Sequence, residues 1–297
     1  MAILDVNHLS KYYGSFKALD NFSLKLEQGQ AYGILGPNGS GKTTALSIIL
    51  GLRHANEGEV IWFDGRSDDA VRRLTGSSLE NPAFLPGLSG AQNLRISADI
   101  KGAPYSEIER VLNKTGLWSY RKRKFHKYSM GMKQRLSIAA ALIGDPEVLI
   151  LDEPTNGLDP QGIYQIRELI LEFTSNGKTL LMASHILSEV EKICNHTLIL
   201  NHGKIIHDGP TDRVLVQKPT LEIASKNLQE LHEALSRYSQ IEYLNRTYGE
   251  LLTAVIDNDF DVAELNEYLV KSGISPHHIV KKQPTLEQQF IELIKEN

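Results

Sequence analysis

The chain has 297 residues, which is long for a single hydrophobic core, so we expect one large domain and one small one. Its formal net charge of -4 excludes a general attraction to nucleic acid or anionic lipid, so any such contact would have to be local. Cys194 is the only cysteine, which excludes an internal disulfide and indicates a buried structural thiol in a reducing compartment. Because no apolar run approaches the ~20 residues that cross a bilayer, we expect any work at a membrane to require a partner.

The first predicted elements are two half-buried antiparallel strands. Residues 2–9 and 18–27 alternate apolar with polar side chains, which is typical of strands with one buried face. Tyr13 lies in the loop predicted between them. An aromatic ring close in sequence to a nucleotide site can stack on a base, and ordinary packing is the alternative for this residue.

The next stretch is a glycine-rich loop between a buried strand, predicted over 32–35, and an apolar helix, predicted over 44–50. The loop reads Gly36-Pro37-Asn38-Gly39-Ser40-Gly41-Lys42-Thr43-Thr44. Its spacing fits a P-loop, in which backbone N–H groups and the helix N-terminus surround a phosphate. We expect Lys42 to reach the β- and γ-phosphates and Thr43 to bind magnesium. The alternative, a plain glycine-rich turn, does not explain the flanking strand and helix.

The middle of the chain is predicted to be mainly helical. Residues 58–65 indicate a strand that closes in a turn, and residues 78–89 form a loop with two prolines that either docks a partner or folds onto its own domain. Residues 91–118 indicate helices with breaks at Gly102 and Pro104.

A basic run and a second helix follow. Residues 121–127 form the strongest basic cluster, which we interpret as a solvated face in preference to a nucleic-acid patch. Ser129 is the predicted N-cap of a helix that extends to Ile143.

Two later strands deliver polar side chains to what should be one edge of a parallel sheet. Residues 148–153 indicate a buried strand that ends in Asp152 and Glu153, and residues 179–185 indicate another that ends in His185. Two buried carboxylates are costly unless a cation or substrate uses them. Asp152 suits a magnesium shell, and Glu153 suits a base that orients or deprotonates water. A strand-to-turn ending and a structural histidine are the alternatives.

Together, residues 1–215 resemble the nucleotide-binding subunits of ATP-binding cassette (ABC) ATPases. That family has an α/β P-loop NTPase core with a mixed sheet, an antiparallel β subdomain and a helical subdomain. The resemblance places Tyr13 at the adenine-stacking aromatic, 36–43 at Walker A, 148–153 at Walker B with catalytic Glu153, and His185 at the switch histidine. It also places 156–160, which includes Asp159, at the D-loop, and 128–135, which includes Ser129 and Gly131, at the signature motif.

Two departures from the family pattern point to a subgroup. Met130 and Met132 replace residues of the usual Leu-Ser-Gly-Gly-Gln signature, and Glu80 stands where the family has a magnesium-contacting glutamine. Both departures resemble bacterial exporters of the daunorubicin and bacitracin resistance type. Residues 216–297 resemble that subgroup's tail, and their predicted strand, helix, strand, strand, helix, strand order over 219–283 fits a small α+β ferredoxin-like accessory domain. A closing helix is expected from Pro284.

The resemblance implies an ATP-binding and hydrolysing subunit that uses ATP and Mg²⁺ and powers a separate membrane permease. It implies a homodimer that clamps each ATP between one P-loop and the partner's signature helix, in the cytoplasm at the inner face of the membrane. Phe84 and Leu85 are then candidate permease contacts, and no nucleic acid is expected. The alternatives are a soluble ABC ATPase that acts on nucleic acid or ribosomes, and a binding module that does not hydrolyse ATP.

Overall fold

The computed structural model describes residues 2–66, 68–79, 83–214, 218–241, 243–246, 251–283 and 290. These residues separate into two compact units, one within 1–214 and the other within 215–295. Among the described residues, no helix combines the length and the apolar character needed to span a membrane. Each unit is described by itself.

The centre of the first unit is a six-stranded sheet with the order β5-β6-β7-β3-β8-β9. The first five strands of that order are mutually parallel, and β9 runs antiparallel to β8. Every residue of β3, β6 and β7 is buried, as expected for strands covered on both faces. The strands are β3 (Ala31–Leu35), β5 (Thr75–Ser78), β6 (Val148–Asp152), β7 (Thr179–Ser184), β8 (His196–Asn201) and β9 (Lys204–Pro210).

Helices follow the parallel strands, so the chain crosses from one strand to the next in the manner of α/β proteins. The predicted P-loop helix begins two residues earlier than expected. These helices are α1 (Lys42–Ile49), α2 (Asp68–Leu74), α6 (Pro160–Ser175), α7 (Leu187–Ile193) and α8 (Thr211–Val214).

A three-stranded antiparallel sheet with the order β2-β1-β4 covers one side of this unit. Its strands are β1 (Ala2–Tyr13), β2 (Phe16–Glu27) and β4 (Glu57–Trp62). The predicted antiparallel pair is confirmed, but both strands are longer than predicted, so Tyr13 ends β1 instead of lying in a loop. Leu4, Phe22 and Leu46 are fully buried in the core between this sheet, α1 and the central sheet.

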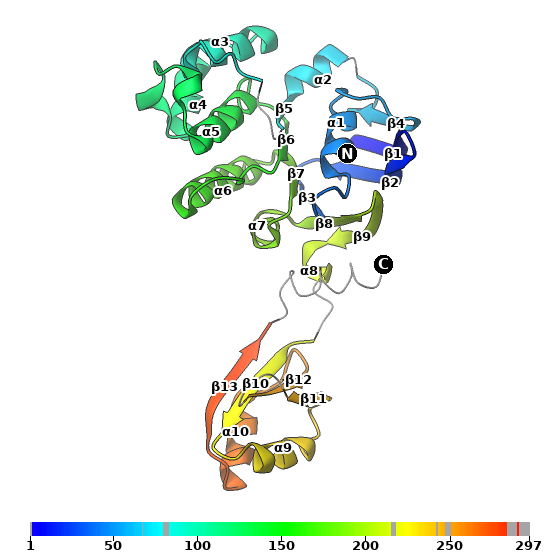
Figure 1. The fold of residues 1–297 in the computed structure, drawn as a ribbon, viewed down its shortest axis with the longest axis vertical. Helices are drawn as coiled ribbons and strands as arrows, with labels where there is room; N and C mark the ends of the chain where they lie inside the picture. The colour runs from blue at the N-terminus through cyan, green and yellow to red at the C-terminus, as the bar shows by residue number, and fades with distance from the viewer. Residues whose placement is uncertain are drawn as a thin grey trace. The chain divides into compact units, whose positions relative to one another are not determined.

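Three helices form a separate group beside the β5 and β6 side of the central sheet, away from β1, β2 and β4 (Figure 1). They are α3 (Gly90–Lys101), α4 (Ser106–Lys114) and α5 (Met130–Ala141). The predicted break at Gly102 is confirmed, because this glycine ends α3 in the left-handed conformation, with φ at 65°. The predicted cap is confirmed as well, because the Ser129 hydroxyl accepts from the Met132 N–H at 3.3 Å.

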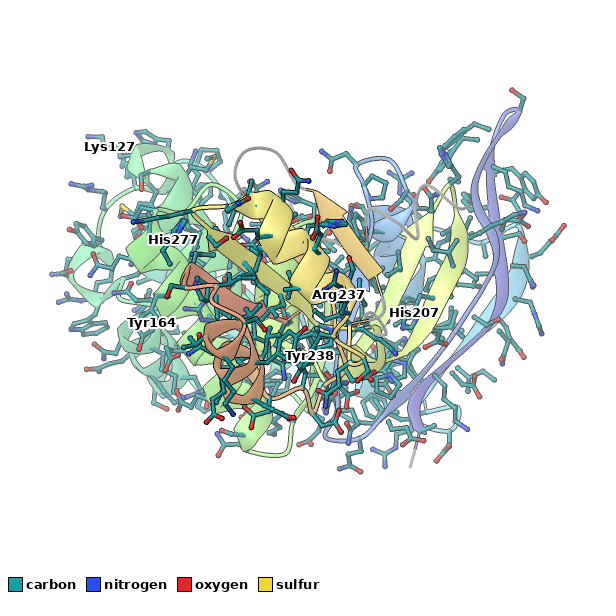
Figure 2. All side chains as sticks on the ribbon, turned by 90° about the horizontal axis from the view of Figure 1, so that it is seen from below. Lys127, Tyr164, His207, Arg237, Tyr238 and His277 are labelled. Atoms are coloured by element: carbon teal, nitrogen blue, oxygen red, sulfur yellow. The ribbon has the colours of Figure 1, made fainter. Side chains whose placement is uncertain are left out.

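The second unit has the predicted order of elements and one antiparallel sheet, arranged β11-β12-β10-β13. Leu221, Leu231 and Leu265 are fully buried in its core. The ring centre of Tyr238, labelled in Figure 2, lies 5.0 Å from the ring centre of Tyr268. The predicted closing helix from Pro284 lies, apart from Phe290, outside the described residues. The elements are β10 (Thr220–Ser225), α9 (Leu228–Ser236), β11 (Tyr243–Arg246), β12 (Leu252–Val255), α10 (Val262–Lys271) and β13 (Pro276–Lys282).

Candidate active site

The candidate site lies where β3, β6 and β7 end. Because β7 pairs in parallel with both β3 and β6, their carboxyl ends share one edge of the sheet. The loop after β3 carries residues 36–41, β6 ends at Asp152 with Glu153 next, and β7 is followed by His185. The sheet therefore brings together the groups that the sequence analysis placed at one edge.

The glycine-rich loop is shaped by close backbone approaches. A Cβ on Gly36 would lie 2.4 Å from the Leu200 carbonyl oxygen, and one on Gly41 would lie 2.5 Å from the Ala18 carbonyl oxygen. Gly41 also has φ at 112°, a left-handed value that glycine adopts without strain. Lys42 then begins α1, and its buried ammonium donates to the carbonyls of Gly36 at 2.8 Å and Pro37 at 3.2 Å. The loop thus folds so that its first two carbonyls contact the ammonium group of Lys42.

Thr43 and Asp152 form the part of the site that suits a metal ion. The Thr43 hydroxyl donates to Asp152 Oδ2 at 2.8 Å, and Asp152 is only 1 % exposed. Mg²⁺ prefers oxygen ligands and usually takes one or two from the protein, with phosphates and water completing its shell. Among the described residues, no group of three or more His, Cys, Asp or Glu side chains can hold a metal alone. The pair therefore fits a magnesium ion that arrives with phosphates, and Glu80 lies outside the described residues.

Glu153 is held in an unusual conformation and by several contacts. Its φ of 49° is left-handed, which costs a non-glycine residue about 1–3 kcal/mol. Its Oε2 lies 2.8 Å from His185 Nδ1, and its Oε1 lies 3.9 Å from Lys42 Nζ. The Gln134 side chain, on α5, donates to the Glu153 carbonyl at 3.3 Å. Helix α5 therefore reaches the carboxylate residue through a buried amide that the sequence analysis gave no role.

Lys42, Thr43, Glu153 and His185 line a pocket of about 440 Å³, within the range of small-molecule sites. Phe16, which the sequence analysis did not predict, also lines it, as does Asn156, the first residue of the predicted D-loop. Tyr13 lines it too, and Arg53 donates to the Tyr13 hydroxyl at 2.9 Å. The other lining residues are Ala18, Asn38, Gly39, Gly41 and Thr44. Gly36, Pro37 and Ser40 of the loop, and Asp152, do not line the pocket.

Ser129, Gly131 and Asp159 do not line this pocket. Ser129 caps α5, and Asp159 caps α6 by accepting from the Gly162 N–H at 2.8 Å. The two caps belong to one surface, because a Cβ on Gly157 would lie 2.2 Å from Met130 Cε and one on Gly131 would lie 3.1 Å from Leu158 Cδ2. Met130 is 66 % exposed there. Ser129, Gly131 and Asp159 thus lie outside the P-loop pocket of their own chain, whereas Asn156 of the same D-loop lines it.

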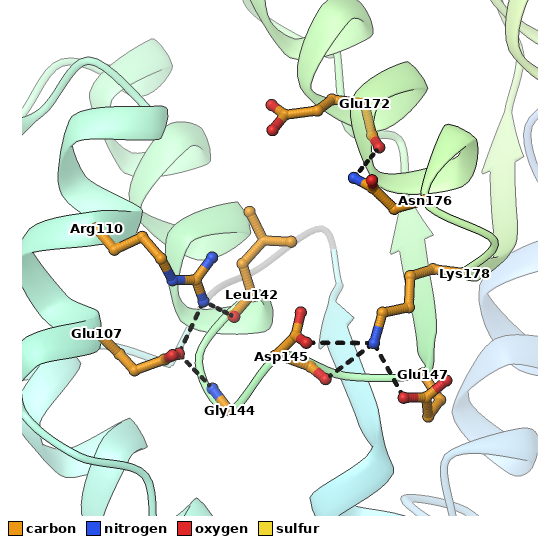
Figure 3. Close-up of polar contacts among 9 residues, drawn as sticks. All are labelled: Glu107, Arg110, Leu142, Gly144, Asp145, Glu147, Glu172, Asn176 and Lys178. Carbon is orange, nitrogen blue, oxygen red and sulfur yellow. Dashed lines mark hydrogen bonds and ion pairs between the residues drawn. The ribbon is translucent and has the colours of Figure 1, made fainter.

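Hydrogen bonds from two neighbouring segments hold the chain in place just before β6 (Figure 3). From α4, the Arg110 guanidinium donates to the Leu142 carbonyl at 3.2 Å, and Glu107 accepts from the Gly144 N–H at 3.0 Å. From the loop before β7, Lys178 donates to Glu147 at 2.9 Å. These bonds fix the strand that positions Asp152 and Glu153 relative to the group of three helices.

The predicted docking loop is only partly exposed. Leu85 is 54 % exposed, in agreement with a contact role. Phe84, which we also expected at the surface, is half-buried, because its ring packs edge to face on Phe125 at 5.1 Å. The basic side chains of 121–127 are exposed or half-buried, as predicted for a solvated face. Cys194 is buried as predicted, and burial raises the pKa of its thiol.

Comparisons with known proteins give one family. The family model described as ABC transporter matches residues 19–156. The bacitracin transport ATP-binding protein BcrA of Bacillus licheniformis is 35 % identical over 98 % of this chain and 97 % of its own length. The lantibiotic transport ATP-binding protein SrtF of Streptococcus pyogenes is 41 % identical over 77 % of this chain and 95 % of its own.

Solved structures of ATP-binding cassettes also resemble this chain. An ATP-binding subunit of an ABC transporter has a TM-score of 0.66 and 29 % identity, with 71 % of this chain and 91 % of that chain covered. The dimeric ATP-binding cassette MJ0796, in a post-hydrolysis state bound to ADP and Pi, has a TM-score of 0.64 and 26 % identity over 70 % and 98 % of the two chains.

Proposed function

Because this chain belongs to the ATP-binding proteins of ABC transporters, it is an ATP hydrolase, and we propose that hydrolysis occurs in the 440 Å³ pocket beside Glu153. One observation carries this proposal. A buried carboxylate lies 2.8 Å from an imidazole nitrogen and 3.9 Å from a lysine ammonium, at the end of the strand that also carries Asp152. A base, its positioning partner and a phosphate-binding cation therefore meet in one pocket.

The residues predicted from the sequence then have the following roles in phosphoryl transfer to water. The Glu153 carboxylate orients the attacking water and accepts its proton, while the His185 ring holds that carboxylate and contacts the γ-phosphate. Lys42 turns from the loop carbonyls toward the β- and γ-phosphates and offsets their charge. Thr43 and Asp152 would hold Mg²⁺, with Glu80 as a further oxygen donor, and a bound ion would supply positive charge beside the phosphates. Tyr13 stacks on the adenine.

The second half of each site comes from a second copy of the chain. Ser129 and Gly131 at the start of α5, with Asp159 at the start of α6, form a surface separate from the P-loop pocket. A helix N-terminus presents N–H groups that suit a phosphate. Two chains arranged head to tail therefore close two equivalent sites, an arrangement supported by the dimeric state of a related cassette.

The work done by this dimer is export through a separate permease. The names of the relatives, which transport bacitracin and lantibiotics, support an exporter for this chain as well. The subunit would act in the cytoplasm at the inner face of the membrane, where exposed Leu85 contacts the permease. Residues 216–297 would form a ferredoxin-like accessory domain, in agreement with the β11-β12-β10-β13 sheet.

Glu153→Gln tests the proposed chemistry. The amide keeps the size of the carboxylate but cannot accept a proton, so we expect ATP turnover to fall by at least ~100-fold while ATP affinity is retained. Glu59→Gln is the matched control, because Glu59 is exposed on β4 and lies outside the pocket. Turnover measured by phosphate release should be unchanged in the control. Wild-type turnover in the Glu153 variant would refute the proposal.

A further inference from the structure

The first turns of α5 pack along the segment that follows β6 and begins with Glu153. The side-chain amide of Gln134, which is only 8 % exposed, donates to the Glu153 carbonyl at 3.3 Å. At the other end of the segment, a Cβ on Gly157 would lie 2.2 Å from Met130 Cε. The helix therefore contacts both ends of segment 153–157. Because packed elements transmit displacements, a shift of the start of α5 also shifts this segment.

The conformation of Glu153 depends on its surroundings. Its φ of 49° is left-handed, and a non-glycine residue keeps such a conformation only where neighbouring contacts fix it. The Glu153 N–H donates to the Ala183 carbonyl at 2.9 Å, and its carbonyl accepts from the Asn156 N–H at 3.1 Å. The Gln134 amide adds a bond from a different helix to the same carbonyl. This bond changes whenever α5 moves relative to β6.

The length of the Gln134 bond makes it sensitive to small movements. Hydrogen bonds between N–H groups and carbonyls usually measure 2.7–3.2 Å and weaken steeply as their geometry departs from the ideal. At 3.3 Å the Gln134 bond is slightly longer than this range. A small shift of α5 toward the segment strengthens the bond, and a small shift away breaks it.

The far end of α5 is anchored to β5. A Cβ on Gly76 would lie 2.1 Å from the Ala141 carbonyl oxygen, so this end of the helix touches the strand backbone. One turn earlier, Ser137 Oγ lies 2.7 Å from Ser78 Oγ. Because this end is held, a force on the start of α5 displaces mainly its first turns, which include Gln134.

The start of α5 is also where the proposed dimer places the partner's ATP. Ser129 and Gly131 face phosphates held by the P-loop of the second copy, as proposed above. Gln134 lies five residues after Ser129, which is about 7.5 Å along a helix axis. A phosphate bound at the start of α5 therefore acts within two turns of the bond that holds the backbone of Glu153.

On the basis of the proposed function, we propose that Gln134 is a positioning residue that makes hydrolysis by Glu153 depend on the ATP bound at the start of α5. That ATP belongs to the P-loop of the partner, whereas Glu153 acts on the ATP of its own chain. ATP at each site of the dimer thus promotes hydrolysis at the other site through one copy of α5.

Steady-state hydrolysis by Gln134→Met tests this role. Methionine keeps the length of the side chain but cannot donate, and the Glu153 carbonyl retains its bond from Asn156. We expect kcat to fall about tenfold and the Hill coefficient for ATP to fall from above 1 in the wild type to 1. The KM should change little, because Gln134 does not line the nucleotide pocket.

Ser137→Ala is the matched control, because it also removes a buried hydrogen bond of α5, but one made to β5. Its kcat and Hill coefficient should equal those of the wild type. Wild-type kcat in Gln134→Met, an equal fall in Ser137→Ala, or a Hill coefficient of 1 in the wild type would each overturn the proposal.

Mixed dimers separate positioning from a general weakening of the dimer. Two copies with different affinity tags are purified together with ATP, and one copy carries Glu153→Gln, so that single-turnover phosphate release reports the intact Glu153 alone. We expect Gln134→Met to slow release when it lies in the copy with the intact Glu153, and to add no effect in the other copy. Equal slowing from either copy, or no release from the dimer with both Gln134 side chains intact, would overturn the proposal.

The proposed function and this inference fail in different ways. Absence of ATP hydrolysis from the wild type would refute the proposed function. Normal wild-type hydrolysis, together with kinetics that do not respond to Gln134→Met, would refute only the role of Gln134.

Discussion

The two units of the molecule differ in what they bury. Among the described residues, the first unit buries four charged side chains, Lys42, Asp152, Glu153 and Glu189, whereas the second unit buries none. All seven described non-glycine residues with positive φ also lie in the first unit, Glu153 among them. Buried charge and backbone strain cost folding free energy. The unit that contains the candidate active site therefore loses folding free energy to buried charge and backbone strain. The second unit has an apolar core without either feature among the described residues.

The charges of the second unit stay at its surface. Glu222 pairs with Lys282 at 2.6 Å and Glu267 with Lys271 at 3.3 Å, and these side chains are substantially exposed apart from Glu222. Exposed pairs contribute little to stability, so the second unit depends on apolar packing. Substitutions in the two units should therefore affect different properties.

The largest effect is expected for Lys42→Met in the first unit. Methionine is similar in length but has no charge, so the γ-phosphate loses its cation in the transition state. We expect ATP turnover to fall by at least ~100-fold, measured by phosphate release. Hydrogen exchange in α9 and α10 should be unchanged. Near-normal turnover would contradict the role of the buried ammonium.

Leu265→Ala should have the opposite profile. Leu265 is fully buried in the core of the second unit, and its truncation should destabilise that unit by about 3 kcal/mol. We expect faster hydrogen exchange in α9 and α10 with ATP turnover unchanged. Val270→Ala, at a residue of α10 that is 55 % exposed, is the control and should have little effect. Loss of turnover in Leu265→Ala would show that the units depend on each other.

A smaller effect, visible only through pH, is expected at Lys101 in the first unit. Burial lowers the pKa of Lys101 from 10.5 to about 8, although Glu107 opposes the shift. Between these values the unfolded chain binds the proton and the folded chain does not, so stability rises with pH. From pH 8 to 9 we expect a gain of about 1 kcal/mol that is absent from Lys101→Met. Urea unfolding measures it, with exposed Lys25→Met as control; the same pH dependence in Lys101→Met and wild type would contradict it.

Much of the fold and of the site was predictable because the signals are local. The runs that form β3, β6 and β7 are recognised by their uninterrupted apolar composition, and the cap at Ser129 is recognised because its hydrogen bond joins sequence neighbours. The resemblance to a known family added the expected roles of Tyr13 and His185.

The remaining features depend on contacts between distant residues. Gln134 reaches the Glu153 carbonyl only because α5 packs near the end of β6. No motif or spacing in the sequence predicts that hydrogen bond. Phe16 enters the pocket because β2 begins two residues earlier than its alternating pattern indicates. A pocket of about 550 Å³ joins residues 89–95 to 118–122 through helix packing, which a basic run alone does not reveal.

The central claim is that two copies of this chain enclose ATP at shared sites. Sedimentation of Glu153→Gln with and without ATP and Mg²⁺ tests it most directly, because this variant should hold ATP without splitting it. We predict a monomer in the absence of nucleotide and a species of twice that mass in its presence. A monomer under both conditions, at protein concentrations where the wild type hydrolyses ATP, would contradict the account.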